Sequence, residues 1–158
     1  MALEIERRFR VSGHAWRASV DRSTRITQGY LAITASAVIR VRVRDDKGYV
    51  TIKSRDGKLA REEFEYPIPL EDARSLLNLC GQQILEKTRH EVTYAGYCWE
   101  IDEYFEPFEN LIIAEVELQS ESEDPPRPPW VGEDITYDGS FSNAALAQRV
   151  EAWRRAKT

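Results

Sequence analysis

The strongest structural signal in this chain lies near its start, in Leu3-Glu4-Ile5-Glu6-Arg7-Arg8-Phe9-Arg10-Val11. Apolar and charged side chains alternate there with the period of two that is typical of a β-strand. Successive side chains of a strand point to opposite faces of the sheet, so the apolar residues share one face. The other face carries Glu4, Glu6, Arg8 and Arg10.

The same alternation returns in four further segments, and the polar face of each is mostly of one charge. These faces carry Arg40, Arg42 and Arg44; Thr51 and Lys53; Glu100 and Asp102; and Glu115 and Glu117. Rows of like charge repel each other unless an opposite row or a ligand neutralises them. We therefore expect a sheet that closes on itself, with basic and acidic walls inside and helices or loops over the apolar outer face.

The composition narrows the class of protein. Among 158 residues, 22 Lys and Arg face 27 Asp and Glu, and this net charge of -5 argues against a general nucleic-acid surface. Two cysteines form neither a metal-binding doublet nor a disulfide framework, and His14 and His90 do not have the spacing of metal ligands. No signal peptide and no membrane-spanning run is visible, so we expect a cytoplasmic protein without a membrane partner.

The remaining pattern predicts a single domain over residues 1–158. Strands are expected at 26–33, 38–44, 49–53, 61–68, 84–94, 97–104 and 111–119, with helices after Ser12 and at 70–80 and 143–156. Gly48 is expected to permit the tight turn between the second and third of these strands. The proline-rich residues 123–129 cannot pair in a sheet, and too little chain follows them for a second core. They are predicted to form a loop against the barrel rim.

Eight motifs in this order resemble the CYTH superfamily, the triphosphate tunnel metalloenzymes, and especially its short bacterial members. They are Glu4-Ile5-Glu6-Arg7-Arg8, Gln28-Gly29-Tyr30-Leu31, Arg40-Val41-Arg42, Lys53, Arg61-Glu62-Glu63-Phe64-Glu65, Lys87-Thr88-Arg89, Glu100-Ile101-Asp102 and Glu115-Val116-Glu117. The resemblance covers nearly the whole chain. It implies an α+β, mainly β fold: a closed eight-stranded antiparallel β-barrel with flanking helices and a C-terminal helix.

The resemblance also implies roles for individual residues in hydrolysis of inorganic triphosphate or a related triphosphate. Phosphates would be bound by Arg8, Arg40, Arg42, Lys53, Arg61, Lys87 and Arg89, and Mg²⁺ or Mn²⁺ by Glu4, Glu6, Asp102, Glu115 and Glu117. Arg8 and Tyr30 would be catalytic. Glu63, Glu65 and Glu100 would either contact the metal or lie just behind its ligands. Carboxylate oxygens suit these cations, and arginine forks match phosphate.

Each role has a structural alternative. Acidic residues on a strand face are often merely solvated, and Arg61 can pair with Glu63 instead of a phosphate. Arg40 and Arg42 can form salt bridges with the acids. Burying many charges only for mutual pairing stabilises a fold poorly, which favours a ligand.

Several functions remain open from the sequence. Thiamine triphosphatase and adenylate cyclase activities share the family. A non-catalytic polyphosphate or nucleotide binder also remains, because Arg8 stands where the family has lysine and arginine cannot act as a base. An RNA-binding barrel is disfavoured, since the basic residues follow the inward face. Either a monomer or a homodimer is expected.

Overall fold

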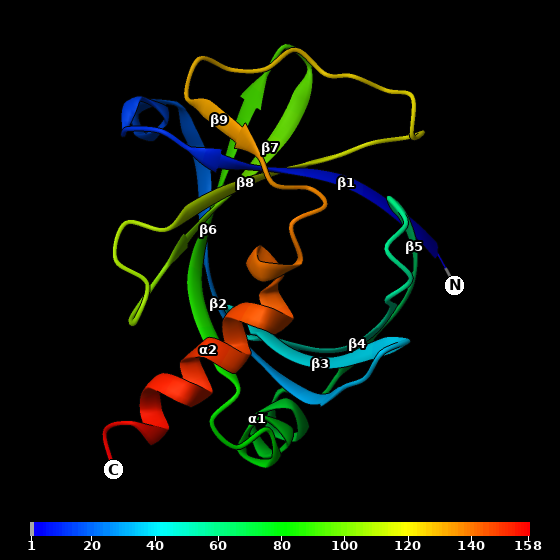
Figure 1. Cartoon of the computed structure of the whole chain (residues 1–158), viewed down its shortest axis with the longest axis vertical. Helices are drawn as coiled ribbons and strands as arrows, with labels where there is room; N and C mark the ends of the chain where they lie inside the picture. Colours follow the sequence, from blue (N-terminus) through cyan, green and yellow to red (C-terminus); the bar gives the residue numbers. More distant parts are fainter. Residues whose placement is uncertain (1) are drawn as a thin grey trace.

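A closed antiparallel barrel forms the body of the computed structural model, which describes residues 2–158 (Figure 1). Its eight strands are β1 (Ala2–Val11), β2 (Val20–Ile33), β3 (Ala37–Arg44), β4 (Lys47–Ser54), β5 (Ala60–Ile68), β6 (Ile84–Tyr94), β7 (Tyr97–Tyr104) and β8 (Ile112–Glu117). They follow the order β5-β4-β3-β2-β6-β7-β8-β1. β1 closes the ring because residues 2–5 pair with β5 while residues 6–10 pair with β8.

The outer face of the barrel is apolar and is covered from two sides. Trp16 in the 3-10 helix η1 (Ala15–Ser19) and Trp130 after the proline-rich loop pack with Phe9 and Trp99 over β1, β7 and β8. The helix α1 (Leu70–Leu79) covers β2, β3 and β4. These coverings allow the charged faces of the strands to point inward, as the alternation predicts.

The C-terminal helix α2 (Asn143–Arg155) closes one end of the barrel interior. Its residues Ala144, Leu146, Ala147 and Val150 are buried in one cluster with inward-facing Tyr30, Leu85 and Tyr104. Figure 1 shows α2 beginning within the ring of strands and running outward to the C-terminus. The 3-10 helix η2 (Gly139–Phe141) leads into it, and the Ser142 hydroxyl accepts a hydrogen bond from the Ala145 amide at its start.

Three details differ from the sequence expectations. The strand expected at 26–33 is longer, since β2 begins at Val20. A short ninth strand, β9 (Val131–Asp134), pairs with the end of β1 after the proline-rich loop. Gly48 lies within β4 rather than in the β3–β4 turn, where Asp45 takes the left-handed conformation with φ of 54°. Gly48 is needed for packing instead, because a Cβ there would lie 2.5 Å from the Cβ of Ala73 in α1. No helix within residues 2–158 is long and apolar enough to cross a membrane.

Candidate functional site: a charged tunnel

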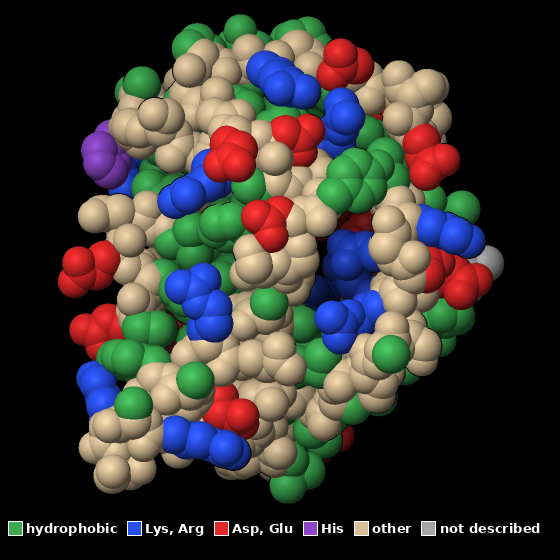
Figure 2. Space-filling view, viewed as in Figure 1, with side chains coloured by type: hydrophobic (Ala, Val, Ile, Leu, Met, Phe, Trp, Pro, Cys, Tyr) green, Lys and Arg blue, Asp and Glu red, His purple; other side chains and the backbone are tan. Residues whose placement is uncertain are grey.

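The barrel encloses a cavity of about 810 Å³. Figure 2 shows it as a hollow with Lys and Arg side chains inside and acidic side chains near its rim. Fourteen of the sixteen residues predicted for the site line it: Glu4, Glu6, Arg8, Tyr30, Arg40, Arg42, Lys53, Arg61, Glu63, Glu65, Arg89, Glu100, Glu115 and Glu117. The other two, Lys87 and Asp102, are wholly buried and lie outside the lining.

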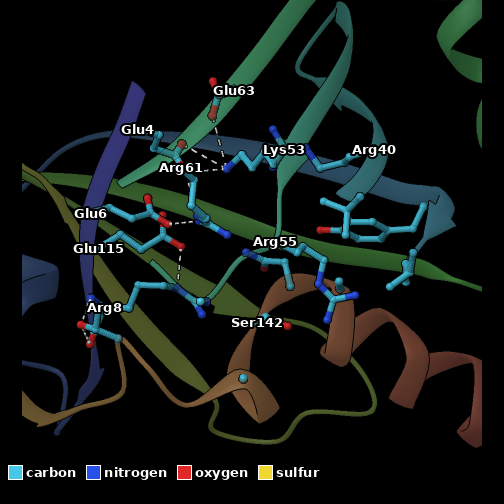
Figure 3. Close-up of a pocket in the computed structure, with 18 of the residues that line it drawn as sticks. Glu4, Glu6, Arg8, Arg40, Lys53, Arg55, Arg61, Glu63, Glu115 and Ser142 are labelled. Carbon is cyan, nitrogen blue, oxygen red and sulfur yellow. Dashed lines mark hydrogen bonds and ion pairs between the residues drawn. The ribbon is translucent and has the colours of Figure 1, made fainter. Parts of the chain in front are cut away.

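The acidic wall comes from β1 and β8, and cations from β4 and β5 reach across to it (Figure 3). Nζ of Lys53 lies 2.8 Å from a carboxylate oxygen of Glu4. Nη2 of Arg61 lies 3.1 Å from the same carboxylate and 3.3 Å from that of Glu6. Glu117 also lines the cavity but is exposed to solvent. The carboxylates are therefore arranged as one wall, with Glu4 and Glu6 in contact with cations.

Arg8 connects the acidic wall to the segment before α2. Its Nε donates to Glu115 at 3.2 Å, and its Nη1 donates to the backbone oxygen of Phe141 at 2.7 Å. The third nitrogen of Arg8, Nη2, is buried and has no hydrogen-bond partner within residues 2–158. The same is true of Nε of Arg40. Both side chains line the cavity, and each carries one buried donor that no acceptor of residues 2–158 satisfies.

Beneath the cavity, three residues form a buried ionic cluster. Asp102 accepts from Nζ of Lys87 at 2.7 Å and from Nε and Nη2 of Arg89 at 2.8 and 2.9 Å. Arg89 also reaches Glu100 at 3.2 Å and Glu115 at 3.3 Å. Burial, although opposed by Asp102, lowers the pKa of Lys87 to about 7. Asp102 therefore contacts only Lys87 and Arg89 in this cluster. Its two hydrogen bonds to Arg89 hold that side chain where it also reaches Glu115 of the acidic wall.

The oxygen donors suit a hard divalent cation. Burial, then Glu115 and Glu4, raise the pKa of Glu6 to about 8. A buried carboxyl that faces two carboxylates is a position where a divalent cation relieves repulsion. In the present arrangement Glu4 and Glu115 contact basic side chains, and within residues 2–158 no three potential ligands converge on a common point.

The structure adds residues that the sequence pattern missed. Arg55 and Lys58 in the β4–β5 loop and Tyr137 after β9 line the mouth of the cavity. Loop residues carry no periodicity that assigns them to a face, although Arg55 and Lys58 follow Lys53 closely. Arg44, on the same charged strand face as Arg40 and Arg42, also lines the cavity.

The fold and its lining define a class: closed β-barrels with an internal tunnel of opposed basic and acidic walls. A family model for the CYTH domain matches residues 2–144, and the chain belongs to this family.

Its relatives include two inorganic triphosphatases. The one from Acetivibrio thermocellus is 38% identical over 94% of this chain and 95% of its own, and that from Nitrosomonas europaea is 32% identical over 93% and 98%. The crystal structure of the inorganic triphosphatase NE1496 superposes with a TM-score of 0.65 and 31% identity over 93% of this chain and 95% of that one. Triphosphatases of the family are metal-dependent in general.

Proposed function

We propose that this chain hydrolyses a phosphoanhydride bond of inorganic triphosphate within the tunnel, using Mg²⁺ or Mn²⁺. The observation that carries the proposal is that six of the predicted phosphate-binding cations line the same cavity as four of the predicted metal-binding carboxylates. The similarity to two inorganic triphosphatases along nearly the whole chain supports the same substrate. The two cysteines are free, which fits a cytoplasmic location.

The proposed roles follow from position. Glu4, Glu6, Glu115 and Glu117 would hold the metal ion, which would neutralise phosphate charge and activate the attacking water. The basic wall would orient the triphosphate and stabilise charge on the leaving phosphate. Asp102 is assigned to orientation of Arg89, with Lys87 as its second partner, because both acidic oxygens are occupied by them.

The test is phosphate release from inorganic triphosphate, pyrophosphate, ATP and thiamine triphosphate, each with Mg²⁺, with Mn²⁺ and with chelator. We expect inorganic triphosphate to be the best substrate, since the cavity lining is dominated by charged groups that suit a compact anion. Higher kcat/KM for ATP or thiamine triphosphate would reassign the substrate.

We predict that chelation removes hydrolysis and that added Mg²⁺ or Mn²⁺ restores it. A triphosphate carries more negative charge than the basic wall alone can hold beside a row of carboxylates. Turnover measured in chelator and after readdition of metal checks this. Undiminished turnover in chelator would contradict the metal assignment.

A Glu4→Gln variant should lose activity but keep its fold, since the amide retains the shape of the side chain without its charge.

We also predict that Arg42→Ala weakens triphosphate binding by about 10- to 100-fold, the equivalent of a lost charge-assisted hydrogen bond. Its unliganded stability should change little, because removal relieves repulsion. Burial, then Arg40 and Arg89, lower the pKa of Arg42 to about 9, so the side chain stays charged at pH 7. Thermal melts with and without triphosphate measure both effects. A much lower melting temperature in both conditions would make Arg42 a structural residue instead.

One observation favours a second candidate, a non-catalytic triphosphate-binding protein. Burial lowers the pKa of Arg8, but Glu115 together with Tyr104, Glu6 and Asp102 outweighs burial and raises this pKa above its ordinary value. Arg8 therefore cannot accept the proton of the attacking water. Tight binding of triphosphate without turnover under any metal would support this candidate.

A further inference from the structure

Gln28 on β2 is a wholly buried polar residue for which the proposed chemistry gives no role. Its Oε1 accepts from Nε and Nη2 of Arg42 at 3.0 and 2.7 Å. Its Nε2 donates to the hydroxyl of Tyr30 at 3.2 Å. The orientation of this amide is fixed chemically, because a guanidinium only donates and must face the amide oxygen. Gln28 thus joins a basic side chain of the cavity to its tyrosine.

Arg42 differs from the other predicted phosphate-binding cations in the charge of its partner. Each of these six has a carboxylate oxygen within 4.0 Å: Arg8 with Glu115, Arg40 with Glu65, Lys53 and Arg61 with Glu4, and Lys87 and Arg89 with Asp102. Arg42 is held by the neutral amide of Gln28 and, within residues 2–158, forms no ion pair. It is also buried in the cavity wall beside Arg40 and Arg89.

A neutral acceptor has a different effect from a carboxylate at this position. Both can fix the guanidinium plane through two hydrogen bonds, but only the carboxylate cancels its charge. With Gln28, Arg42 is oriented and its full positive charge remains for an anion in the cavity. Because the amide nitrogen donates to Tyr30, the hydroxyl hydrogen of Tyr30 is left free to donate to another acceptor. Tyr30 lines the same cavity.

We propose that Gln28 is a positioning residue that aims Arg42 and Tyr30 at the triphosphate while leaving the charge of Arg42 unneutralised. This inference rests on the proposed function. It accounts for a buried amide at a place where the other predicted phosphate-binding cations have acidic partners. We therefore predict that, without ligand, the wild-type protein is less stable than a variant with glutamate at position 28.

The test compares Gln28→Glu with Gln28→Met. Glutamate gives Arg42 an ion pair and turns the Tyr30 hydroxyl toward itself, whereas methionine removes both hydrogen bonds without changing the charge. Gln82→Glu is the matched control, since Gln82 is exposed after α1 and does not line the cavity. Melting temperature without ligand, triphosphate affinity by calorimetry, and kcat and KM are measured for each.

We expect triphosphate affinity and unliganded melting temperature to rank the variants differently. Affinity for triphosphate should fall from wild type to Gln28→Met to Gln28→Glu, with a loss of at least tenfold in the last and less than twofold in Gln82→Glu. The unliganded melting temperature should be highest in Gln28→Glu and lowest in Gln28→Met. In Gln28→Met the loss should appear in kcat as well as KM, because Tyr30 loses its donor. On an Arg42→Met background, Gln28→Glu should have little further effect on affinity.

Two results would overturn the inference. One is a Gln28→Glu protein that binds triphosphate as tightly as wild type. The other is a set of affinities that simply follows the melting temperatures, which is what a structural role produces. If Gln28→Glu does not fold, unchanged kcat and KM in Gln28→Met would overturn it equally. Failure of the proposed function is separate, because it is seen in the wild type alone: either triphosphate does not bind, or it binds and is not hydrolysed with any metal.

Discussion

Replacing Asp102 with asparagine should lower the free energy of unfolding by about 3–5 kcal/mol, the range for breaking a buried ion pair. The carboxylate is fully buried and accepts hydrogen bonds from Lys87 and Arg89. Without its charge, two cations share a site that water does not reach. Denaturant unfolding at pH 7 measures the loss. Asp46→Asn is the control, because Asp46 is exposed in the β3–β4 turn and its change should stay within about 0.5 kcal/mol.

The pH dependence gives this prediction a second readout. Burial raises the pKa of Asp102, but Arg89 and Lys87 outweigh burial and lower it below the ordinary value of 3.8. A carboxyl with a lowered pKa stabilises the folded state at pH values above its unfolded pKa and loses this contribution as pH falls. The difference between wild type and Asp102→Asn should therefore be largest near neutral pH and shrink below about pH 3.8. A difference that is constant down to acid pH would show that the charge of Asp102 is not its source.

Replacing Arg8 with lysine should raise kcat on the order of tenfold, or about 1.4 kcal/mol in activation free energy, or else move the pH profile. Burial at position 8 would lower the pKa of a lysine, although Glu115 opposes this, and lysine gives up its proton far more readily than arginine, which keeps its proton in proteins. Substrate affinity should change modestly, because the positive charge is retained. The kcat and KM values across pH check this result.

The same variant should also lose some stability. A single Nζ cannot reproduce both the bond to Glu115 and the bond to the Phe141 oxygen, so about 1.5 kcal/mol should be lost. Arg10→Lys is the control, since Arg10 is exposed further along the same strand face. A lower kcat with an unchanged pH profile would show that Arg8 stabilises charge in a way lysine cannot. Turnover that appears only in Arg8→Lys would identify the wild type as a binder.

The arrangement of Arg8 suggests why an arginine is useful here apart from proton transfer. Two of its nitrogens donate to different parts of the fold, Nε to Glu115 on the acidic wall and Nη1 to the Phe141 oxygen in the segment that leads into α2. The single Nζ of a lysine could not donate to both acceptors in this geometry. The chain therefore gains a fixed connection between β1 and the closing helix at the position where the family resemblance expects a lysine.

The sequence by itself determined the barrel and the composition of its interior. Alternation with period two fixes which side chains share a face, so the inward position of Glu4, Glu6, Arg40 and Arg42 was predictable from local pattern alone. The helices at 70–79 and 143–155 were also predictable from their apolar spacing. In each case the signal is local, because neighbouring residues alone decide it.

Only the tertiary structure decided how deep each inward side chain lies in the barrel and which residue it contacts. The pattern that places Lys87, Arg89 and Asp102 on the inner face is the same as for Arg42, yet Lys87 and Asp102 lie beneath the cavity. Strand register across the closed barrel and the entry of α2 at one end set that depth, and neither leaves a local signal. The pairing of Arg42 with the neutral Gln28 arises likewise from register between β2 and β3, because a strand face specifies direction but not the residue opposite.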